Sequence, residues 1–342
     1  MSPIAEALKA LAEQISEATT HFGHSVDVQA MRVTNRHGQL ALASPTTRSP
    51  NGACRMVRAV DGWLAVNLAR DEDRELVPAW LRREVSYDPW VDIARRICEL
   101  DCAELIADAV MLGLPVARVG EVECDSLEPR CTKMSRGPNA SRGGQLRVLD
   151  FSALWAGPLC CAVLARMGAS VTRAESLRRP DPMRIAAPEF FQRLNGLKAE
   201  LPLDLSTLED RGRLLDKVLT SDVIVTSARP LALEKLGLSP EIVFAENPSV
   251  VWVAITGYGW SGECSLRVAF GDDAAAAGNL VYWSPKGTPR FLGDALADPI
   301  TGLSAAIGAL EGLKSGGGAF VDAALAKSAA AVAASYLRRS LQ

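Results

Sequence analysis

The chain has 342 residues, of which 48% are hydrophobic and 23% charged, and its formal net charge is −3. That length predicts two domains, and the composition is typical of an ordinary soluble globular protein. The small net charge gives no electrostatic reason to expect nucleic acid or an anionic membrane as a partner.

The first 22 residues are predicted to form an amphipathic helix whose apolar stripe must be buried against something. This segment has no basic n-region and no apolar h-region, so it does not read as a signal peptide. The most apolar late stretch, 323–337, is interrupted by Lys327 and is too short to span a bilayer. We therefore expect a cytoplasmic protein without a membrane partner.

A small α+β domain is predicted at 46–131, after an N-terminal helix and connecting arm at 1–45. Residues 54–68 alternate in polarity like a β-hairpin, in which Asp61-Gly62 supplies the turn. Two helices are expected after this hairpin, near 71–83 and near 88–112.

From residue 146 to residue 342 strands and helices alternate, which predicts an α/β domain with a Rossmann-like, mostly parallel sheet. The preceding stretch, 132–145, is rich in Gly, Ser, Asn and Pro and is interpreted as a linker. The domain begins with a strand–loop–helix–strand unit at Arg147–Glu175, with Gly168 as the expected helix C-cap. Later helices are expected near Phe190 and at 207–219, 231–236 and 301–313, and later strands at 201–205, 223–225, 250–255 and 319–323.

The loop 152–157 of this first unit is a candidate ligand site, because the helix that follows it leaves backbone N–H groups free for an anion. The loop lacks the G-x-G-x-x-G pattern of dinucleotide-binding folds. From these residues alone, a nucleotide-type ligand and a plain α/β core both remain open.

Eight cysteines raise the question of a metal site or disulfides, and their spacing argues against both. Cys98 and Cys102 are predicted to share a helix face, but no second cysteine or histidine pair mirrors them as a zinc half-site would. Cys160 and Cys161 lie in the apolar helix after the first strand, which favours buried free thiols. We therefore expect no metal.

Among the carboxylates, Asp298 stands out because it immediately precedes Pro299 and a helix expected to begin near Thr301. It is either a helix N-cap or a functional group at the carboxyl edge of the parallel sheet, where open α/β folds bind ligands. The pair Asp272-Asp273 allows the same two interpretations. Three basic residues read as ordinary surface charges: Arg184, Lys198 and Lys235.

From Arg147 to Lys327 the chain resembles the family III CoA-transferases, also called the CaiB/BaiF family. The segments that carry the resemblance are VLDFSALWAGPLCCAVLARMGASVTRAE, FFQRLNGLKAELPLDLS, SDVIVTSARPLALEKLGLSPE, NPSVVWVAITGYG and DALADPITGLSAAIGAL. They occur in the family's order and at its spacing, over more than half of the chain. The resemblance implies a Rossmann-like large domain that binds CoA, together with a smaller domain.

The family's small domain usually follows the large one, whereas this sequence ends soon after its final expected strand. Segments similar to the family's small domain occur instead in the N-terminal portion, as NRHG, CRMVRAVDGWLAV and LGLPVARV. The resemblance therefore implies a circular permutation that places the small domain first.

The resemblance also implies an activity, the transfer of CoA from an acyl-CoA to a carboxylic acid. The family's nucleophile is an aspartate, and Asp298 in ADPITG matches it. Its carboxylate would form first a mixed anhydride and then an aspartyl-CoA thioester, which conserves the thioester's free energy. This chemistry needs no metal and no tightly bound cofactor, because CoA itself is the substrate.

The positions that match CoA-binding residues of the family are Trp155, Ala156, Lys198, Ser227, Ala228, Lys235 and Tyr258. Ser227 and Ala228 replace a usual Asn-Phe pair, and Lys235 replaces an arginine that pairs with the CoA phosphates. Ser176 stands where members similar to formyl-CoA transferase have a basic residue.

Two other functions remain open. An α-methylacyl-CoA racemase of the same family needs a histidine just before the aspartate of the motif that reads here AFGDDAAAAG. Phe270 or Gly271 occupies that place, and no histidine follows His37, so transfer is favoured over racemization. The second alternative is a non-catalytic CoA-binding subunit.

Family members form dimers in which each chain passes through the ring made by its partner, so the resemblance implies an interlocked homodimer. The loop-rich stretches 23–50 and 132–145 can bridge large distances at small entropic cost. The alternative is a monomer whose first helix folds back on its own large domain.

Overall fold

The computed structural model describes residues 3–84, 88–135 and 144–340. Contacts between Cα atoms divide the chain into two compact units, each assembled from three segments. Unit 1 consists of Met1–Leu40, Glu128–Thr256 and Pro299–Ala324. Unit 2 consists of Ala41–Leu127, Gly257–Asp298 and Leu325–Gln342.

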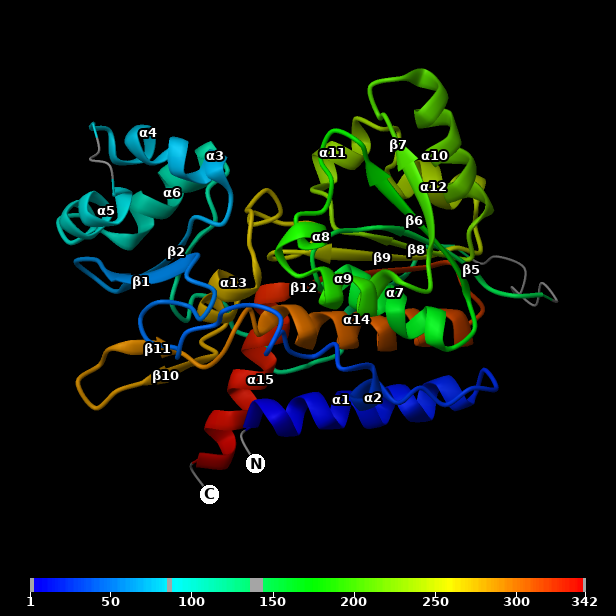
Figure 1. The fold of residues 1–342 in the computed structure, drawn as a ribbon, viewed down its shortest axis with the longest axis horizontal. Helices are drawn as coiled ribbons and strands as arrows, with labels where there is room; N and C mark the ends of the chain where they lie inside the picture. The colour runs from blue at the N-terminus through cyan, green and yellow to red at the C-terminus, as the bar shows by residue number, and fades with distance from the viewer. Residues whose placement is uncertain (1–2, 85–87, 136–143, 341–342) are drawn as a thin grey trace. The chain divides into compact units, whose positions relative to one another are not determined.

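Unit 1 contains a seven-stranded sheet with the order β4-β12-β9-β8-β5-β6-β7 (Figure 1). Its strands are β4 (Arg130–Lys133), β5 (Arg147–Phe151), β6 (Ser170–Ser176), β7 (Ala199–Leu203), β8 (Val223–Thr226), β9 (Val251–Thr256) and β12 (Ala319–Ala324). All neighbours are parallel except β4, which pairs antiparallel with β12. The central strands β8 and β9 are almost fully buried, as expected for a sheet covered on both faces. The predicted α/β fold with a mostly parallel sheet is confirmed.

Helices cover both faces of this sheet, with α7 and α14 on one face and α10 and α12 on the other (Figure 1). The helices that lie in unit 1 or begin at its edge are α1 (Pro3–Thr20), α2 (Val28–Met31), α7 (Ala156–Arg166), α8 (Met183–Ala186), α9 (Pro188–Asn195), α10 (Leu208–Thr220), α11 (Pro230–Glu234), α12 (Pro240–Glu246) and α14 (Ala297–Lys314). A Cβ atom on Gly302 would lie 2.7 Å from the carbonyl oxygen of Ala156. Glycine at this position therefore lets α14 pack closely against the first turn of α7.

Unit 2 has its own sheet, an antiparallel β1-β2-β3 arrangement, and a separate hairpin formed by β10 and β11. Its strands are β1 (Cys54–Arg58), β2 (Trp63–Asn67), β3 (Val116–Arg118), β10 (Val281–Trp283) and β11 (Pro289–Phe291). Its helices are α3 (Asp71–Glu75), α4 (Val77–Leu81), α5 (Pro89–Ile97), α6 (Cys102–Leu112), α13 (Gly271–Ala277) and α15 (Leu325–Ser340). Buried side chains from the sheet and from α4–α6, among them Trp80, Trp90 and Leu105, form a core of this unit.

The hairpin predicted at 54–68 is confirmed, with Cys54 opposite Asn67 and Arg58 opposite Trp63. The helix predicted near 88–112 is instead two helices, α5 and α6, so the prediction that Cys98 and Cys102 share a helix face was wrong. Cys98 caps the end of α5, and the carboxylate of Asp61 accepts the N–H of Cys102 at 2.8 Å where α6 begins. A capping carboxylate from outside the segment thus starts the second helix.

The linker predicted at 132–145 begins later than expected, because residues 132 and 133 pair with β12 as part of β4. Its stretch 136–143 lies outside the described residues. Unit 2 also includes 257–298 and 325–342, which were predicted from the sequence to belong to the large domain. The domain bounds drawn from the sequence stay a prediction.

The cysteines are all free thiols, as expected. Cys160 and Cys161 are fully buried in α7, and burial raises the pKa of both thiols. Burial is not general, however, since Cys98, Cys131 and Cys264 are exposed.

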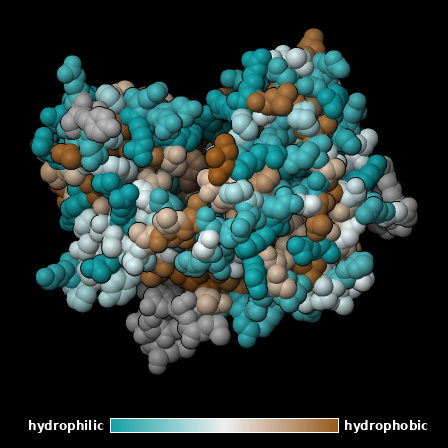
Figure 2. All heavy atoms as spheres, in the orientation of Figure 1, coloured by the Kyte–Doolittle hydropathy of each residue, from teal (hydrophilic) through white to brown (hydrophobic). Residues whose placement is uncertain are grey.

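Most of the surface shown in Figure 2 is hydrophilic, with smaller hydrophobic areas between. In the part of the chain that the structure describes, no helix is both long and apolar enough to cross a membrane.

Candidate active site

Asp298 lies in the first turn of α14 and is partly exposed. The expectation that this helix begins near Thr301 was wrong, because it begins at Ala297. Pro299 does not interrupt it, since a first-turn residue needs no hydrogen bond for its N–H. The backbone N–H of Asp298 donates to the carbonyl oxygen of Ala295 at 3.0 Å. The carboxylate therefore stands at the positive end of the helix dipole.

Gly271, the first residue of α13, lies directly against the Asp298 carboxylate. A Cβ atom on Gly271 would overlap with Oδ2 of Asp298 and would lie 2.7 Å from the carbonyl oxygen of Ala295. Only glycine leaves room for the carboxylate in this position. In the sequence, Gly271 stood out only as a place where a racemase histidine is absent.

The loop before Asp298 contains Ala295 in the left-handed region, with φ of 46°. That conformation costs a residue with a side chain about 1–2 kcal/mol. Oδ1 of Asp272 accepts the Ala295 N–H at 2.7 Å, and Asp272 is only 3% exposed. This buried hydrogen bond to a carboxylate offsets the cost and ties the loop to the start of α13.

Asp273, the neighbour of Asp272, caps α13. Its carboxylate accepts the N–H of Phe270 at 3.0 and 3.2 Å and a hydrogen bond from Nδ2 of Asn67 at 2.7 Å. It is fully buried, and burial raises its pKa well above the ordinary value. The two adjacent aspartates thus have different roles, one capping the helix and the other holding the loop before Asp298.

Tyr258 is buried in unit 2 beneath the guanidinium group of Arg267, whose Cζ lies 3.9 Å from the ring centroid. Arg267 donates to the Tyr258 hydroxyl at 3.0 Å and forms an ion pair with Glu121 at 2.5 Å. Burial raises the pKa of Tyr258 well above its usual range. This cluster anchors the segment between β9 and α13. No sequence pattern had pointed to Arg267 or Glu121.

In unit 1, Trp155 and Ala156 begin α7. The indole of Trp155 is 2% exposed, and its Nε1 donates to the carbonyl oxygen of Val33 at 2.9 Å. The guanidinium of Arg36 lies 4.9 Å from the same ring, and Phe190 packs edge-on against it. Trp155 is therefore held firmly by residues from the N-terminal arm and α9.

The loop that leads into Trp155 uses its backbone N–H groups internally. Each donates to a side-chain oxygen: Ser152 to Asp150 at 3.1 Å, Ala153 to Ser227 at 3.1 Å, and Leu154 to Asp181 at 3.0 Å. These contacts hold Leu154 in the left-handed region, with φ of 67°. The N–H groups of 152–154 are thus already occupied, and the hydroxyl of Ser227 is part of this support.

Lys198 is not a surface charge, and that expectation was wrong. Its ammonium group is fully buried and forms an ion pair with Asp150 at 2.7 Å. It also donates to the carbonyl oxygen of Pro158 at 2.9 Å and to Oδ1 of Asn195 at 2.8 Å. These three contacts use all three donors of the ammonium group. Lys198 therefore supports the loop through Asp150, and its predicted contact with CoA stays a prediction.

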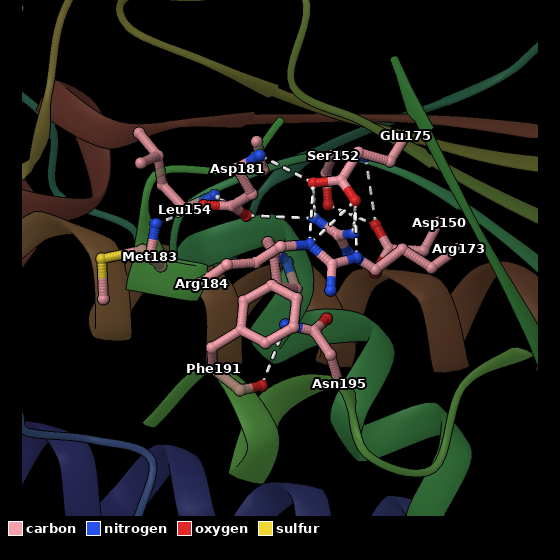
Figure 3. A network of polar contacts seen from close by, with 12 residues as sticks. Asp150, Ser152, Leu154, Arg173, Glu175, Asp181, Met183, Arg184, Phe191 and Asn195 are labelled. Atoms are coloured by element: carbon pink, nitrogen blue, oxygen red, sulfur yellow. Dashed lines mark hydrogen bonds and ion pairs between the residues drawn. The ribbon is translucent and has the colours of Figure 1, made fainter. Parts of the chain in front are cut away.

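A second network, drawn in Figure 3, holds the same loop from the end of β6. Its ion pairs are Arg173 with Glu175 at 2.8 Å and with Asp181 at 3.1 Å, and Arg184 with Glu175 at 2.5 Å and with Glu200 at 2.6 Å. Burial alone would raise the pKa of Glu175, but hydrogen bonds from Arg184 and Arg173 lower it to about 2. Arg184, read from the sequence as an ordinary surface charge, is thus part of a network that reaches Leu154 through Asp181.

Four of the predicted CoA-binding residues lie at the carboxyl edge of the parallel sheet. Trp155 and Ala156 follow β5, and Ser227 and Ala228 follow the adjacent strand β8. Ligands of open α/β sheets bind at this edge. Lys235 lies farther along, exposed at the end of α11. Among the described residues, no group of three or more His, Cys, Asp or Glu side chains is arranged to hold a metal.

The family model for CoA-transferase family III matches residues 144–341, more than half of the chain. This match agrees with the resemblance noted from Arg147 to Lys327. It does not reach the N-terminal block, so the circular permutation stays a prediction.

Two curated relatives illustrate the similarity. The beta subunit of succinyl-CoA–L-malate CoA-transferase from Chloroflexus aurantiacus is 33% identical over 197 residues, covering 54% of this chain and 49% of that protein. Succinyl-CoA:mesaconate CoA-transferase from Haloarcula hispanica is 32% identical over 200 residues, covering 53% and 50%. The chain thus spans about half the length of the curated relatives it matches.

A similar solved structure is that of a CaiB/BaiF family protein from Brucella suis. It is 27% identical, with a TM-score of 0.52, and the match covers 57% of this chain and 56% of that one.

Proposed function

Because this chain belongs to CoA-transferase family III, we propose that it moves coenzyme A from an acyl-CoA donor to a carboxylic acid acceptor. The observation that carries the proposal is the Asp298 carboxylate, partly exposed in the first turn of α14 and accommodated by Gly271. Relatives named for transfer from succinyl-CoA to malate or mesaconate suggest the class of substrates, an acyl-CoA and a small dicarboxylic acid.

In the proposed mechanism the Asp298 carboxylate attacks the thioester carbonyl of the donor. The C–S bond breaks, which leaves a mixed anhydride and a CoA thiolate. The thiolate then attacks the aspartyl carbonyl of the anhydride and releases the donor acid, so that Asp298 carries CoA as a thioester. The acceptor carboxylate opens this thioester to a second anhydride, and the thiolate attacks its acceptor carbonyl, which regenerates Asp298.

We assign CoA binding to Trp155, Ala156, Lys198, Ser227, Ala228, Lys235 and Tyr258. Their contributions differ. Lys235, with an exposed ammonium group, suits a phosphate as a point charge. Lys198 and Ser227 act by supporting the loop before Trp155, through Asp150 and through the N–H of Ala153.

The proposal includes a cytoplasmic location and a homodimer. The racemase alternative has no support here, because Phe270 and Gly271 occupy the place where the acid–base histidine is expected. A non-catalytic subunit is the second candidate, favoured by the changes at Ser227 and Ala228 and by a relative that is itself named a beta subunit.

The test is exchange between acyl-CoA and free acids, followed by mass spectrometry of products and protein. Succinyl-CoA is offered with malate, mesaconate and other short acids, and Asp298→Asn is the matched control. Transfer with a covalent CoA adduct on the Asp298 peptide supports the enzyme. Binding of CoA without transfer or adduct supports the non-catalytic subunit.

A further inference from the structure

Asn51, in the N-terminal segment of unit 2, makes four hydrogen bonds with its side chain. Its Nδ2 donates to Oδ2 of Asp272 at 2.6 Å and to Oδ1 of Asp294 at 2.8 Å. Its Oδ1 accepts the backbone N–H of Ala53 at 2.8 Å and the hydroxyl of Ser49 at 3.0 Å. Every donor and acceptor of the amide is thus used. Because the backbone N–H of Ala53 can only donate, the amide oxygen must face Ala53, and the amide nitrogen then faces the two aspartates.

These contacts lead directly to Asp298. The Asp272 carboxylate links Asn51 to the loop before Asp298. Its Oδ2 accepts from Nδ2 of Asn51, and its Oδ1 accepts from the backbone N–H of Ala295. Ala295 in turn accepts the N–H of Asp298, and Gly271, next to Asp272, bounds the Asp298 carboxylate. Each link is a hydrogen bond or a close packing contact within unit 2.

We propose that Asn51 is a positioning residue for the Asp298 carboxylate. Asp272 and Asp294 are 3% and 8% exposed, and both accept hydrogen bonds from the same neutral amide. Without the amide, the two buried carboxyl groups lose a shared donor, and the loss of a hydrogen-bond partner at a buried polar group costs stability. The loop that carries Ala295 then relaxes, and the Asp298 carboxylate leaves its place over Gly271.

The expected effect of Asn51 on the reaction rate rests on the proposed function, whereas its expected effect on the loop around Ala295 does not. Covalent catalysis requires the carboxylate in near-attack geometry, where a displacement of about 1 Å can cost on the order of 100-fold in rate. The Asn51 amide has no donor or acceptor left for acyl-CoA, because all four of its hydrogen bonds are to groups of the protein. Loss of the amide should therefore slow the covalent step and leave substrate affinity nearly unchanged.

The test compares Asn51→Ala with Asn67→Ala, because Asn67 also comes from this N-terminal segment and binds the adjacent Asp273. Amide hydrogen exchange of the peptide 292–299 measures how often the loop opens, and this measurement does not require an active enzyme. Single-turnover formation of the CoA adduct at saturating acyl-CoA reports the reaction. Asn51→Ala should speed exchange in 292–299 by about tenfold and slow adduct formation by about 10- to 100-fold, with KM changed less than twofold. Asn67→Ala should lower thermal stability while changing exchange and adduct formation less than threefold.

A second variant, Asn51→Asp, keeps the size of the side chain but adds a third carboxylate. Burial beside two other acidic side chains should raise the pKa of the new carboxyl above the ordinary value of about 3.9. Its protonated form restores one donor, so adduct formation in this variant should recover relative to wild type as the pH falls from about 8 to about 5.

Unchanged exchange in Asn51→Ala would overturn the proposal, whether or not the wild type transfers CoA. So would faster exchange with an unchanged adduct rate, or equal effects of Asn51→Ala and Asn67→Ala. If Asn51→Ala does not fold, Asn51→Asp decides, and a pH profile parallel to that of wild type would contradict the role. A wild type without adduct rejects the proposed enzyme function, and the exchange measurement then decides the position of the loop alone.

Discussion

The Asp298 carboxylate occupies the space that a side chain on Gly271 would fill. The two residues are 27 positions apart in the sequence (298 − 271) and belong to the starts of two different helices, α14 and α13. The place of the proposed nucleophile is therefore defined by the absence of one methyl group.

Gly271→Ala should displace the Asp298 carboxylate, because the new Cβ overlaps with Oδ2. We expect adduct formation to fall about 100-fold, as for other misplacements of about 1 Å, while CoA affinity is retained. Pre-steady-state mass spectrometry measures the rate of adduct formation, and calorimetry measures the affinity for CoA. The control is Gly212→Ala in α10, where a Cβ meets no atom within 4 Å and where alanine is the better helix former. Equal adduct rates in Gly271→Ala and wild type would show that the carboxylate works from another position.

Lys198 and Lys235 should respond differently to replacement by alanine. Lys198→Ala leaves Asp150 buried without its ion pair, and loss of one partner of a buried pair costs about 3–5 kcal/mol. Lys235→Ala changes an exposed side chain, so stability should stay within about 0.5 kcal/mol. The KM for acyl-CoA should rise in Lys235→Ala with little change in kcat, as lost ground-state binding does. Chemical denaturation measures the stability of both variants, and steady-state kinetics measures their KM and kcat. A Lys198→Ala protein as stable as wild type would contradict the importance of the buried pair.

The Glu175 network makes stability depend on pH in a defined window. The pKa of Glu175 is lowered from 4.5 to about 2 in the folded state, where burial is outweighed by hydrogen bonds from Arg184 and Arg173. Because the folded pKa lies below the unfolded one, its contribution is complete above about pH 4.5 and is lost as the pH falls toward 2. Glu175→Gln should therefore be less stable than wild type at pH 7, with a difference that shrinks below pH 4.5. Glu263→Gln, at an exposed position, is the control, and a constant difference across the window would contradict the linkage.

Local patterns predicted much of the fold. The strand–loop–helix–strand unit from Arg147 and the hairpin at 54–68 follow from periodicity and turn residues close together in the sequence. The split of the helix near 88–112 was missed because the capping carboxylate, Asp61, comes from another segment.

The candidate site was predicted less completely. The ADPITG motif placed Asp298, but the residues that hold it there are far apart in the chain: 221 positions separate Asn51 from Asp272. The pairing of Lys198 with Asp150, across 48 positions, was likewise missed because a lysine in a polar stretch reads as exposed. Such contacts leave no periodic pattern in the sequence, since tertiary packing alone brings the partners together.

The central claim, that Asp298 is the covalent nucleophile, is tested most directly with an acceptor acid whose carboxylate oxygens are ¹⁸O. In the proposed mechanism the second anhydride is opened at the acceptor carbonyl, so one acceptor oxygen stays on Asp298. After turnover, the peptide that contains Asp298 should carry ¹⁸O in the wild type, and Asp298→Asn should neither transfer CoA nor take up label. Transfer of CoA without ¹⁸O in that peptide would contradict the account.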